Sequence, residues 1–285
     1  MAWVFLMPTI IVMGVFQFLP MVCAFALSLW DYFPNAPENQ FVFLDNFIRL
    51  LHDSAFWLSV RNSLLYLLCV PIIVVLSLGL ALLVEPKIPG IGFFRACYYL
   101  PVVTMMVVVA FAWSLIFDTD NGLLNAFLAA AGISEEGIGW LTNERYALWS
   151  VMAVTVWKGL GYYMVLFIVG LKAVPMELRE AARIDGANSI QSFFNVTIPS
   201  LWPVISIASI ISSISALQVF EEIYMMTNGR VGTSTVVFDI YETGFDMGNG
   251  GIDLGYASAM GVVLFAIIFS FTAISARKMD SMYAK

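Results

Sequence analysis

The stretch Arg61-Asn-Ser-Leu-Leu-Tyr-Leu-Leu-Cys-Val-Pro-Ile-Ile-Val-Val-Leu-Ser-Leu-Gly-Leu-Ala-Leu-Leu-Val-Glu85 decides the fold class of this sequence. No charged side chain lies between Arg61 and Glu85, and nearly every residue there is apolar. A helix needs about 20 apolar residues to cross the ~30 Å hydrocarbon core of a bilayer. The stretch therefore predicts a membrane-spanning helix.

Five further apolar stretches lie on the two sides of this one. The six expected spans are Val4–Trp30, Ser59–Val84, Leu100–Phe117, Ala147–Leu171, Leu201–Tyr224 and Gly255–Ala276. In the whole chain 61% of residues are hydrophobic and 12% are charged, whereas soluble domains average about 25% charged residues. An outer-membrane barrel would show short alternating segments instead. We therefore expect an all-α integral membrane protein whose residues 1–285 form one transmembrane domain of six helices.

Side chains suited to catalysis or metal binding are sparse. Cys23, Cys69 and Cys97 are isolated and His52 is the one histidine, so no disulfide framework, zinc site or Ser-His-Asp triad is expected. The sequence holds no G-x-x-x-x-G-K-S/T phosphate loop. We expect a non-catalytic chain that binds no metal and no cofactor itself. The first apolar stretch is expected to be a retained span, because it lacks the charged leader and cleavage site of a signal peptide.

Basic residues are divided unevenly between the two sets of connections, and lysine and arginine are enriched on the cytoplasmic side of membrane proteins. One set and the C-terminal tail hold Lys87, Arg95, Lys172, Arg179, Arg183, Arg277, Lys278 and Lys285. The other set holds Arg49, Arg61, Arg145 and Arg230 together with most of the acidic residues. We expect a multi-pass protein in the lipid bilayer of the cytoplasmic (inner) membrane, with the first set and both termini cytoplasmic. The net charge of −7 argues against nucleic-acid binding.

The connection between the fourth and fifth expected spans, Lys172–Pro199, is the most informative part of the sequence. The run Met176–Asp185 favours a helix, and Gly186 suits the left-handed residue that ends one. Asn188, with Gln191 three residues later, suits the start of a second short helix. We therefore expect a helix-turn-helix on the inner face of the membrane.

This connection resembles the one found in permeases of binding-protein-dependent ABC importers, whose signature is E-A-A, three residues, G, nine residues and I-x-L-P. Here Glu180-Ala181-Ala182 is followed by Gly186 and, after nine residues, by Val196-Thr-Ile-Pro199. Val for Ile and Ile for Leu are the two departures. An ordinary amphipathic loop is the alternative interpretation. The position on the basic side, after the fourth of six spans, favours the family.

The resemblance implies a methionine-importer-like six-helix permease fold with a cytoplasmic coupling helix that docks on an ATPase subunit. The residues implied to couple to the ATPase are Glu180, Ala181, Ala182, Ile184, Asp185 and Gly186. Other segments, such as Arg61–Leu64, Tyr98–Pro101 and Asp253–Met260, are similar to those of the carbohydrate-uptake branch, in particular the first of the two maltose-importer-type permeases.

That resemblance also implies the partners and the function. The partners are a second homologous permease chain, two ATP-binding cassette subunits that bind ATP and Mg, and an extracytoplasmic solute-binding protein. The function is to form half of the translocation path for a sugar, polyol or glycerol-phosphate-type solute by ATP-driven alternating access.

Polar and aromatic residues inside the fourth and fifth spans are the candidates for the substrate path. They are Trp157, Lys158, Tyr162, Tyr163, Ser209, Ser213, Gln218 and Glu221. A lysine inside a membrane needs a partner or water. Lys158 therefore either lies near the path or pairs with an acceptor that locks the bundle, and the second interpretation is favoured. The serines either line the path or let helices pack closely, and the aromatics either stack on a sugar or belong to the membrane belt. In both cases the second interpretation is favoured.

Two other classes of function remain as alternatives. An autonomous channel or ion-coupled secondary transporter would need charged or broken-helix ion sites near the midplane, and Lys158 alone supports it. A membrane-embedded enzyme would need a nucleophile, metal or paired-acid cluster within the spans, and the sequence shows none.

Overall fold

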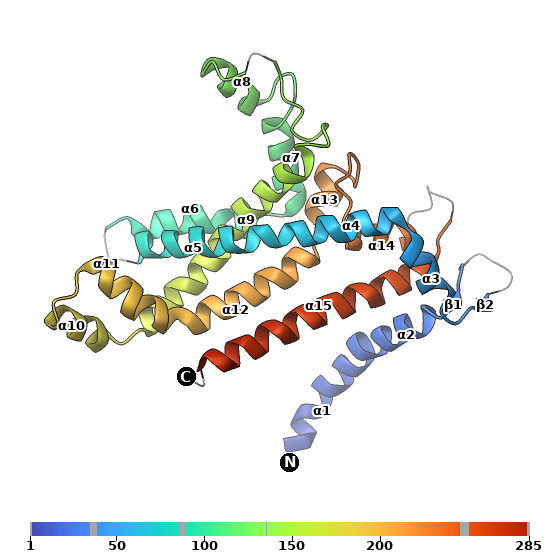
Figure 1. Ribbon diagram of the computed structural model, residues 1–285, viewed down its shortest axis with the longest axis horizontal. Helices are drawn as coiled ribbons and strands as arrows, with labels where there is room; N and C mark the ends of the chain where they lie inside the picture. The colour runs from blue at the N-terminus through green and yellow to red at the C-terminus, as the bar shows by residue number, and fades with distance from the viewer. Residues whose placement is uncertain (1, 35–38, 86–88, 135, 246–250, 284–285) are drawn as a thin grey trace. The chain divides into compact units, whose positions relative to one another are not determined.

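A computed structural model describes residues 2–34, 39–85, 89–134, 136–245 and 251–283, and these are mostly helical (Figure 1). Lys87 and Lys285, used above to orient the chain, lie outside the described residues, as does the side chain of Lys278. The chain forms two compact units, one of residues 1–61 with 234–274 and one of residues 62–233 with 275–285.

The first unit combines the start of the chain with most of its last helix. Its elements are α1 (Ala2–Met13), η1 (Gly14–Phe18), α2 (Leu19–Leu27), β1 (Trp30–Asp31), β2 (Gln40–Phe41), α3 (Asp45–His52), the start of α4 (Ser54–Leu65), α14 (Val236–Phe245) and most of α15 (Leu254–Tyr283). β1 and β2 pair antiparallel, with Trp30 opposite Phe41. The buried core of the unit is formed by Leu50, Phe56, Val60, Val236, Tyr256, Met260 and Leu264.

Polar contacts fix the turn between α2 and α3 and its neighbour α15. The amide of Asn46 donates to the carbonyl oxygens of Ser28 and Trp30 at 3.0 and 2.9 Å. Gly255, at the start of α15, lies so close that a Cβ there would be 2.0 Å from the Trp30 carbonyl oxygen. The Arg49 guanidinium forms a 2.9 Å ion pair with Asp253. These contacts hold the start of α15 against the segment that follows the first span.

Asp239, on α14, is a half-buried carboxyl in the same unit. Its pKa is raised to about 6, chiefly because burial disfavours the charged form. Hydrogen bonds with Ser234 and Ser59 oppose this rise, and the negative charges of Glu242 and Asp53 add to it. Since the unfolded carboxyl has a pKa of about 3.9, the folded protein holds this proton more tightly than the unfolded chain.

Deprotonation of Asp239 is therefore less favourable in the folded protein. We expect it to lower the free energy of unfolding by up to about 2 kcal/mol as pH rises from about 4 to about 6.5. This contribution is absent in Asp239→Asn, so the melting temperature of that variant in detergent should fall less over the same range. The matched control is Asp120→Asn, at an exposed aspartate, which should keep the wild-type profile. Identical profiles for the two variants would show that Asp239 ionises like a solvated aspartate.

The second unit is a bundle of helices around α9. Its elements are the end of α4, η2 (Tyr66–Leu68), α5 (Cys69–Val84), α6 (Ile91–Val103), α7 (Met106–Ile116), α8 (Leu123–Ala130), α9 (Ala147–Ala173), α10 (Met176–Ile184), α11 (Ser189–Ser192), η3 (Phe193–Thr197), α12 (Ile198–Leu217) and α13 (Glu221–Met226). α9 packs against α5, α6 and α12.

Small residues on α9 allow this packing, as is common between membrane helices. A Cβ on Gly161 would lie 2.2 Å from the Tyr98 carbonyl oxygen of α6. A Cβ on Gly170 would lie 2.9 Å from a methyl group of Val204 on α12. On the side of α5, the Ser77 hydroxyl donates to the Leu160 carbonyl at 3.1 Å. Glycine thus sets how closely two of the three neighbours approach α9.

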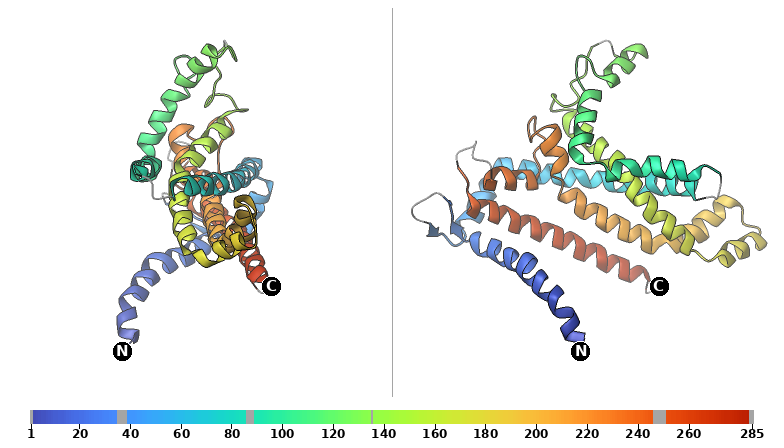
Figure 2. Two further views of the ribbon diagram at one scale, coloured as in Figure 1. Left: turned by 90° about the vertical axis from the view of Figure 1, so that its left-hand side faces the viewer. Right: turned by 180° about the vertical axis from the view of Figure 1, so that it is seen from behind.

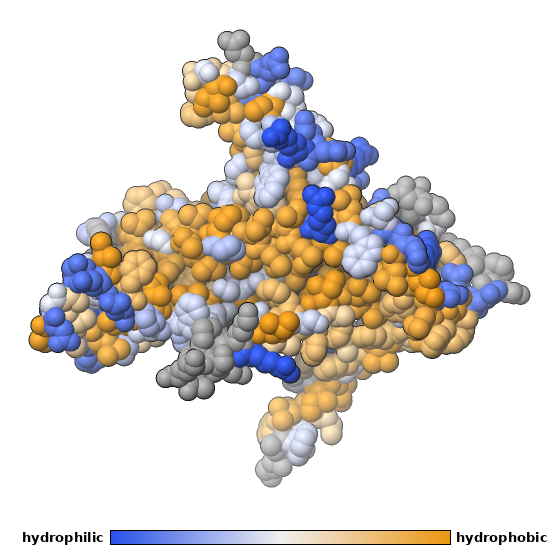
Figure 3. Space-filling model, in the orientation of Figure 1, coloured by the Kyte–Doolittle hydropathy of each residue, from blue (hydrophilic) through white to orange (hydrophobic). Residues whose placement is uncertain are grey.

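Among the described residues, five helical stretches are long and apolar enough to cross a membrane. They are Phe5–Leu27, Ser54–Val84, Ala147–Ala173, Ser189–Leu217 and Leu254–Arg277, and the bent pair α6 and α7 would make a sixth. Many large apolar side chains on these helices face outward, with Val75 67% and Leu83 71% exposed. Figure 3 shows the resulting hydrophobic surface over α5 and α12, with hydrophilic residues gathered at α10 and α11. Such a surface suits lipid, and the all-α membrane fold expected from the sequence is confirmed.

The expected span Leu100–Phe117 is divided between two helices. α6 ends at Val103, α7 begins at Met106, and their axes differ by 100°; Figure 2 shows α7 leaving the direction of α6. The chain is extended at Thr104, where ψ is 134°. The β-branched residues before the break disfavour helix, and the Thr104 hydroxyl donates to the Leu100 carbonyl at 2.8 Å, which satisfies an acceptor at the helix end.

The fifth expected span, Leu201–Tyr224, also differs from the structure. α12 ends at Leu217, residues 218–220 are not helical, and α13 starts at Glu221. The break places Glu221 and Glu222 in the first turn of a new helix, where the helix dipole stabilises negative charge. Hydropathy alone does not reveal such a break, because the flanking residues remain apolar.

Candidate functional site

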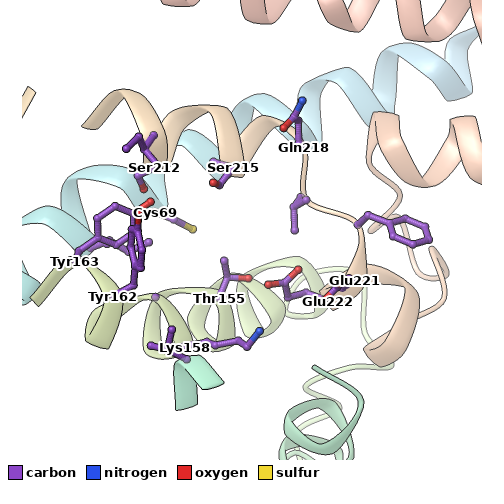
Figure 4. A pocket seen from close by; sticks show the side chains of 17 residues that line it. Cys69, Thr155, Lys158, Tyr162, Tyr163, Ser212, Ser215, Gln218, Glu221 and Glu222 are labelled. Carbon is purple, nitrogen blue, oxygen red and sulfur yellow. The ribbon is translucent and has the colours of Figure 1, made fainter. Parts of the chain in front are cut away.

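Helices α5, α9, α12 and α13 surround a cavity of about 700 Å³ in the second unit (Figure 4). α9 contributes Thr155, Lys158 and Tyr162, which recur at three- and four-residue spacing and so share one face of the helix. α12 contributes Ser212 and Ser215 from the opposite side. The cavity is therefore lined by hydroxyl groups from two facing helices.

Opposite charges meet at the α13 end of this cavity. Lys158 projects from α9, and Glu222 projects from α13 toward it (Figure 4). Their charges attract each other electrostatically, which lowers the cost of placing a cation within the bundle. Glu221 lines the same cavity. Lys158 thus combines the two interpretations given above, since it lines a cavity and also faces an acidic partner.

Two tyrosines form the aromatic part of the lining. The rings of Tyr162 and Tyr163 meet edge to face, with centroids 5.0 Å apart. Tyr163 is buried, whereas Tyr162 is 45% exposed. An aromatic ring offers an apolar face to a sugar ring while its hydroxyl bonds polar groups. This lining suits a solute that carries both hydroxyl groups and apolar C–H faces.

The structure brings together most of the residues proposed for the substrate path. Lys158, Tyr162, Tyr163, Gln218 and Glu221 line the cavity. Trp157, Ser209 and Ser213 do not. The Trp157 ring packs edge to face against Trp113 of α7, with ring centroids 5.4 Å apart. The hydroxyls of Ser209 and Ser213 donate to carbonyl oxygens of their own helix, at 2.8 and 2.7 Å, which agrees with the interpretation of these serines as packing residues.

Several lining residues were not among the candidates from sequence. They are Cys69, Thr155, Ser212, Ser215 and Glu222. The spacing of Thr155, Lys158 and Tyr162 was a usable signal, because it marks one polar face on an apolar helix. Ser212 and Ser215 gave no such signal, since the serines of α12 occur on more than one side and their periodicity does not say which side is turned to α9.

The hairpin of α10 and α11 has the local geometry expected from the sequence. Gly186 has φ +84°, and the backbone N–H of Ala187 donates to the Ala182 carbonyl at 2.9 Å, as in a glycine-ended helix. The side chain of Asn188 accepts from the Gln191 N–H at 2.8 Å, and the Gln191 side chain accepts from the Asn188 N–H at 2.9 Å. The predicted turn and capping box are confirmed.

The outer surface of α10 carries apolar side chains without cover from the described chain. Ile184 is 86% exposed, Met176 is 74% exposed and Leu178 is 48% exposed. Glu180 and Ala181 lie on the exposed surface with them. Met176, Glu180 and Ile184 share one face of α10 at four-residue spacing, while Leu178 lies on another side. Exposed apolar side chains on an otherwise polar element are typical of a protein contact.

Residues 58–280 match the family described as "Binding-protein-dependent transport system inner membrane component". The chain belongs to this family, and the resemblance stated above is confirmed.

Relatives and solved structures agree with this assignment. A probable ABC transporter permease protein of Bacillus subtilis is 34% identical, over 93% of this chain and 91% of that protein. The trehalose/maltose transport system permease protein of Thermococcus litoralis is 32% identical, over 96% of this chain and 92% of that protein.

A crystal structure of a bacterial ABC transporter that imports the acidic polysaccharide alginate has the same fold. Its matching chain has a TM-score of 0.84 and 20% identity, with 98% of this chain and 95% of that chain covered. A methionine ABC transporter matches with a TM-score of 0.53 and 17% identity, over 79% of this chain and 96% of that chain. The chain is therefore an inner-membrane permease with the importer fold.

Proposed function

We propose that this chain forms half of the translocation path for a sugar or polyol, by ATP-driven alternating access with a second homologous permease chain. The observation that carries the proposal is the cavity lined by Tyr162, Tyr163 and hydroxyl groups from α9 and α12. The trehalose/maltose relative supports a sugar. Within this half, Glu221 and Glu222 line the cavity together with Lys158. This excess of acidic groups favours a neutral solute over a glycerol-phosphate-type one.

Filling the cavity tests this function. Ser215 lines the cavity from α12, and the indole of Ser215→Trp would occupy part of it. We expect uptake of radiolabelled trehalose or maltose by proteoliposomes, or of whichever sugar the wild type transports, to fall by about tenfold or more. A loss of that size corresponds to about 1.4 kcal/mol of disfavoured solute passage.

The matched control is Ile207→Trp, on the same helix but outside the cavity, where the side chain is 47% exposed. Both variants should assemble with their partners to the wild-type extent on a sizing column. Normal uptake by an assembled Ser215→Trp complex would remove this cavity from the path. A wild-type chain that transports without any obligate partner would favour the autonomous carrier instead.

We infer that ATP hydrolysis is supplied by two separate ATP-binding cassette subunits, which bind ATP and Mg, and that an extracytoplasmic binding protein delivers the solute. The alginate importer was solved in complex with its periplasmic protein, which supports such an assembly. The exposed apolar side chains of α10 support docking on an ATPase subunit. The residues proposed for this contact are Glu180, Ala181, Ala182, Ile184, Asp185 and Gly186.

We also propose that the α10–α11 hairpin and both termini are cytoplasmic, because basic residues gather on that side. Single cysteines at Gln191 and Asn39, in a chain whose native cysteines are replaced by serine, distinguish the two orientations. An impermeant thiol reagent applied to intact spheroplasts should label position 39 and leave position 191 unlabelled. The reverse pattern would contradict the orientation.

A further inference from the structure

A second cavity, of about 400 Å³, lies between α10 on one side and α11 and η3 on the other. Figure 2 shows these elements as a hairpin beyond one end of α5 and α12. Arg179 and Arg183, four residues apart on α10, both line this cavity. Four-residue spacing places them on one face of the helix, and this face borders the cavity.

The two guanidinium groups are not neutralised by the described part of the chain. The Nε atom of Arg179 is buried and has no hydrogen-bond acceptor among the described residues. Neither arginine forms an ion pair with a described carboxylate. A buried donor without an acceptor is unfavourable unless a ligand or water completes it. The Nε atom of Arg179 therefore lacks an acceptor among the described residues, whereas Arg183 is exposed to solvent.

The acidic residues nearby do not supply that acceptor. Glu85, after the end of α5, is the one described carboxylate that lines the cavity, and it lies beyond ion-pair distance of both arginines. The carboxylates of Glu177 and Glu180, on the same helix as the arginines, do not line it. Two cations against one anion leave the cavity positive, so an anion is the ligand favoured by charge.

The remaining lining indicates which kind of anion fits. Ser189 and Ser192 add hydroxyl groups, and Phe193 adds an apolar side. Guanidinium groups bind phosphate oxygens through paired, charge-assisted hydrogen bonds, and hydroxyl groups can bind the same oxygens. A phosphate group with an apolar attachment matches this combination.

The place of the cavity in the fold favours a lipid as the source of that phosphate. The cavity lies where two membrane-spanning stretches end, Ser54–Val84 and Ser189–Leu217. The ends of spans lie at the level of lipid headgroups, and basic pockets there bind anionic headgroups. Ile190 and Phe194, next to the cavity, are 69% and 61% exposed, as side chains at an acyl-chain boundary would be.

We propose that this cavity binds the phosphate group of an anionic phospholipid, and that the bound lipid ties the α10–α11 hairpin to the membrane surface. The site is separate from the solute cavity, and it requires only that the chain spans a membrane as described. Lipid binding at this site can therefore be tested independently of which solute the protein transports.

Lipid retention by the intact complex tests the proposal. The complex containing the full chain is purified in detergent, mixed with equal amounts of phosphatidylglycerol and phosphatidylcholine of the same acyl chains, and analysed by native mass spectrometry. We expect the wild type to retain phosphatidylglycerol about tenfold more than phosphatidylcholine. Arg179→Gln combined with Arg183→Gln should bring the two lipids near parity.

The matched control combines Lys172→Gln with Arg277→Gln, which removes the same charge from the same side of the chain outside the cavity. It should keep the wild-type preference. Arg179→Lys combined with Arg183→Lys keeps the positive charge but loses the paired hydrogen bonds of the guanidinium groups. Its preference for phosphatidylglycerol should lie between those of the wild type and the glutamine variant. If the glutamine variant misfolds, the lysine variant still tests whether the paired hydrogen bonds contribute to the lipid preference.

Several outcomes would overturn the proposal. An unchanged preference in the glutamine variant, or an equal loss in the control, would show that these arginines do not form the site. Displacement of phosphatidylglycerol by millimolar inorganic phosphate would indicate a site for soluble phosphate. Loss of the co-purifying ATPase with unchanged lipid retention would assign the two arginines to that protein contact instead.

Discussion

Replacing Gly161 by alanine should lower the melting temperature of the detergent-solubilised protein by about 5–10 °C, which corresponds to roughly 2–3 kcal/mol. A Cβ at this position would lie 2.2 Å from the Tyr98 carbonyl oxygen and 2.9 Å from a Val102 methyl group. The nearest of these atoms belongs to the backbone of α6, so a rotamer change cannot relieve the clash. α6 would have to move away from α9.

Gly159, two residues earlier on α9, provides the control for this prediction. Its Cβ would meet the Ile73 side chain at 3.5 Å, which is ordinary van der Waals contact. Gly159→Ala adds the same methyl group and should leave the melting temperature unchanged or raise it, because alanine favours helix by about 1 kcal/mol over glycine. Equal melting temperatures for the two variants would contradict the close approach of α6 to α9.

The second large effect is expected from Gly186→Val in the α10–α11 turn. The space around Gly186 is open, but its φ of +84° disfavours any side chain and a β-branched one most of all. The strain of about 1–2 kcal/mol or more should displace α11 relative to α10. We expect uptake and binding-protein-stimulated ATP hydrolysis by the reconstituted complex to fall about tenfold, with the spans still inserted.

Gly132→Val is the matched control. Gly132 follows α8, has φ +70°, and is also surrounded by open space. The backbone strain is therefore similar, but it falls on an expected outer connection, and uptake should stay within about twofold of the wild type by the same strain argument. Full transport by Gly186→Val at wild-type abundance would show that the turn has no part in coupling.

Features set by local chemistry could be predicted from the sequence. The turn at Gly186 and the capping box of Asn188 with Gln191 depend on residues only a few positions apart, and the structure has both. The helical spans depend on apolar length, which is read directly from the chain. Membership of the permease family followed from the spacing of Glu180, Gly186 and Pro199 on this loop.

Features set by packing could not be predicted in the same way. The side of α12 that faces α9 is chosen by contacts between distant helices, so Ser212 and Ser215 line the cavity while Ser209 does not. The break after Leu217 leaves the apolar pattern unchanged, and the pattern therefore predicts one helix through to Tyr224. Glu222 was missed for the same reason, because its direction depends on that break.

The bend between α6 and α7 has a mechanical consequence. The change of direction is made by Thr104 and Met105, which have ψ angles of 134° and 139°. Rotation about the bonds of these two residues would swing α7 like a rigid rod without melting a turn of either helix. The pair therefore has the form of a hinge, and a reorientation of α7 against α6 would require a change at only these two residues.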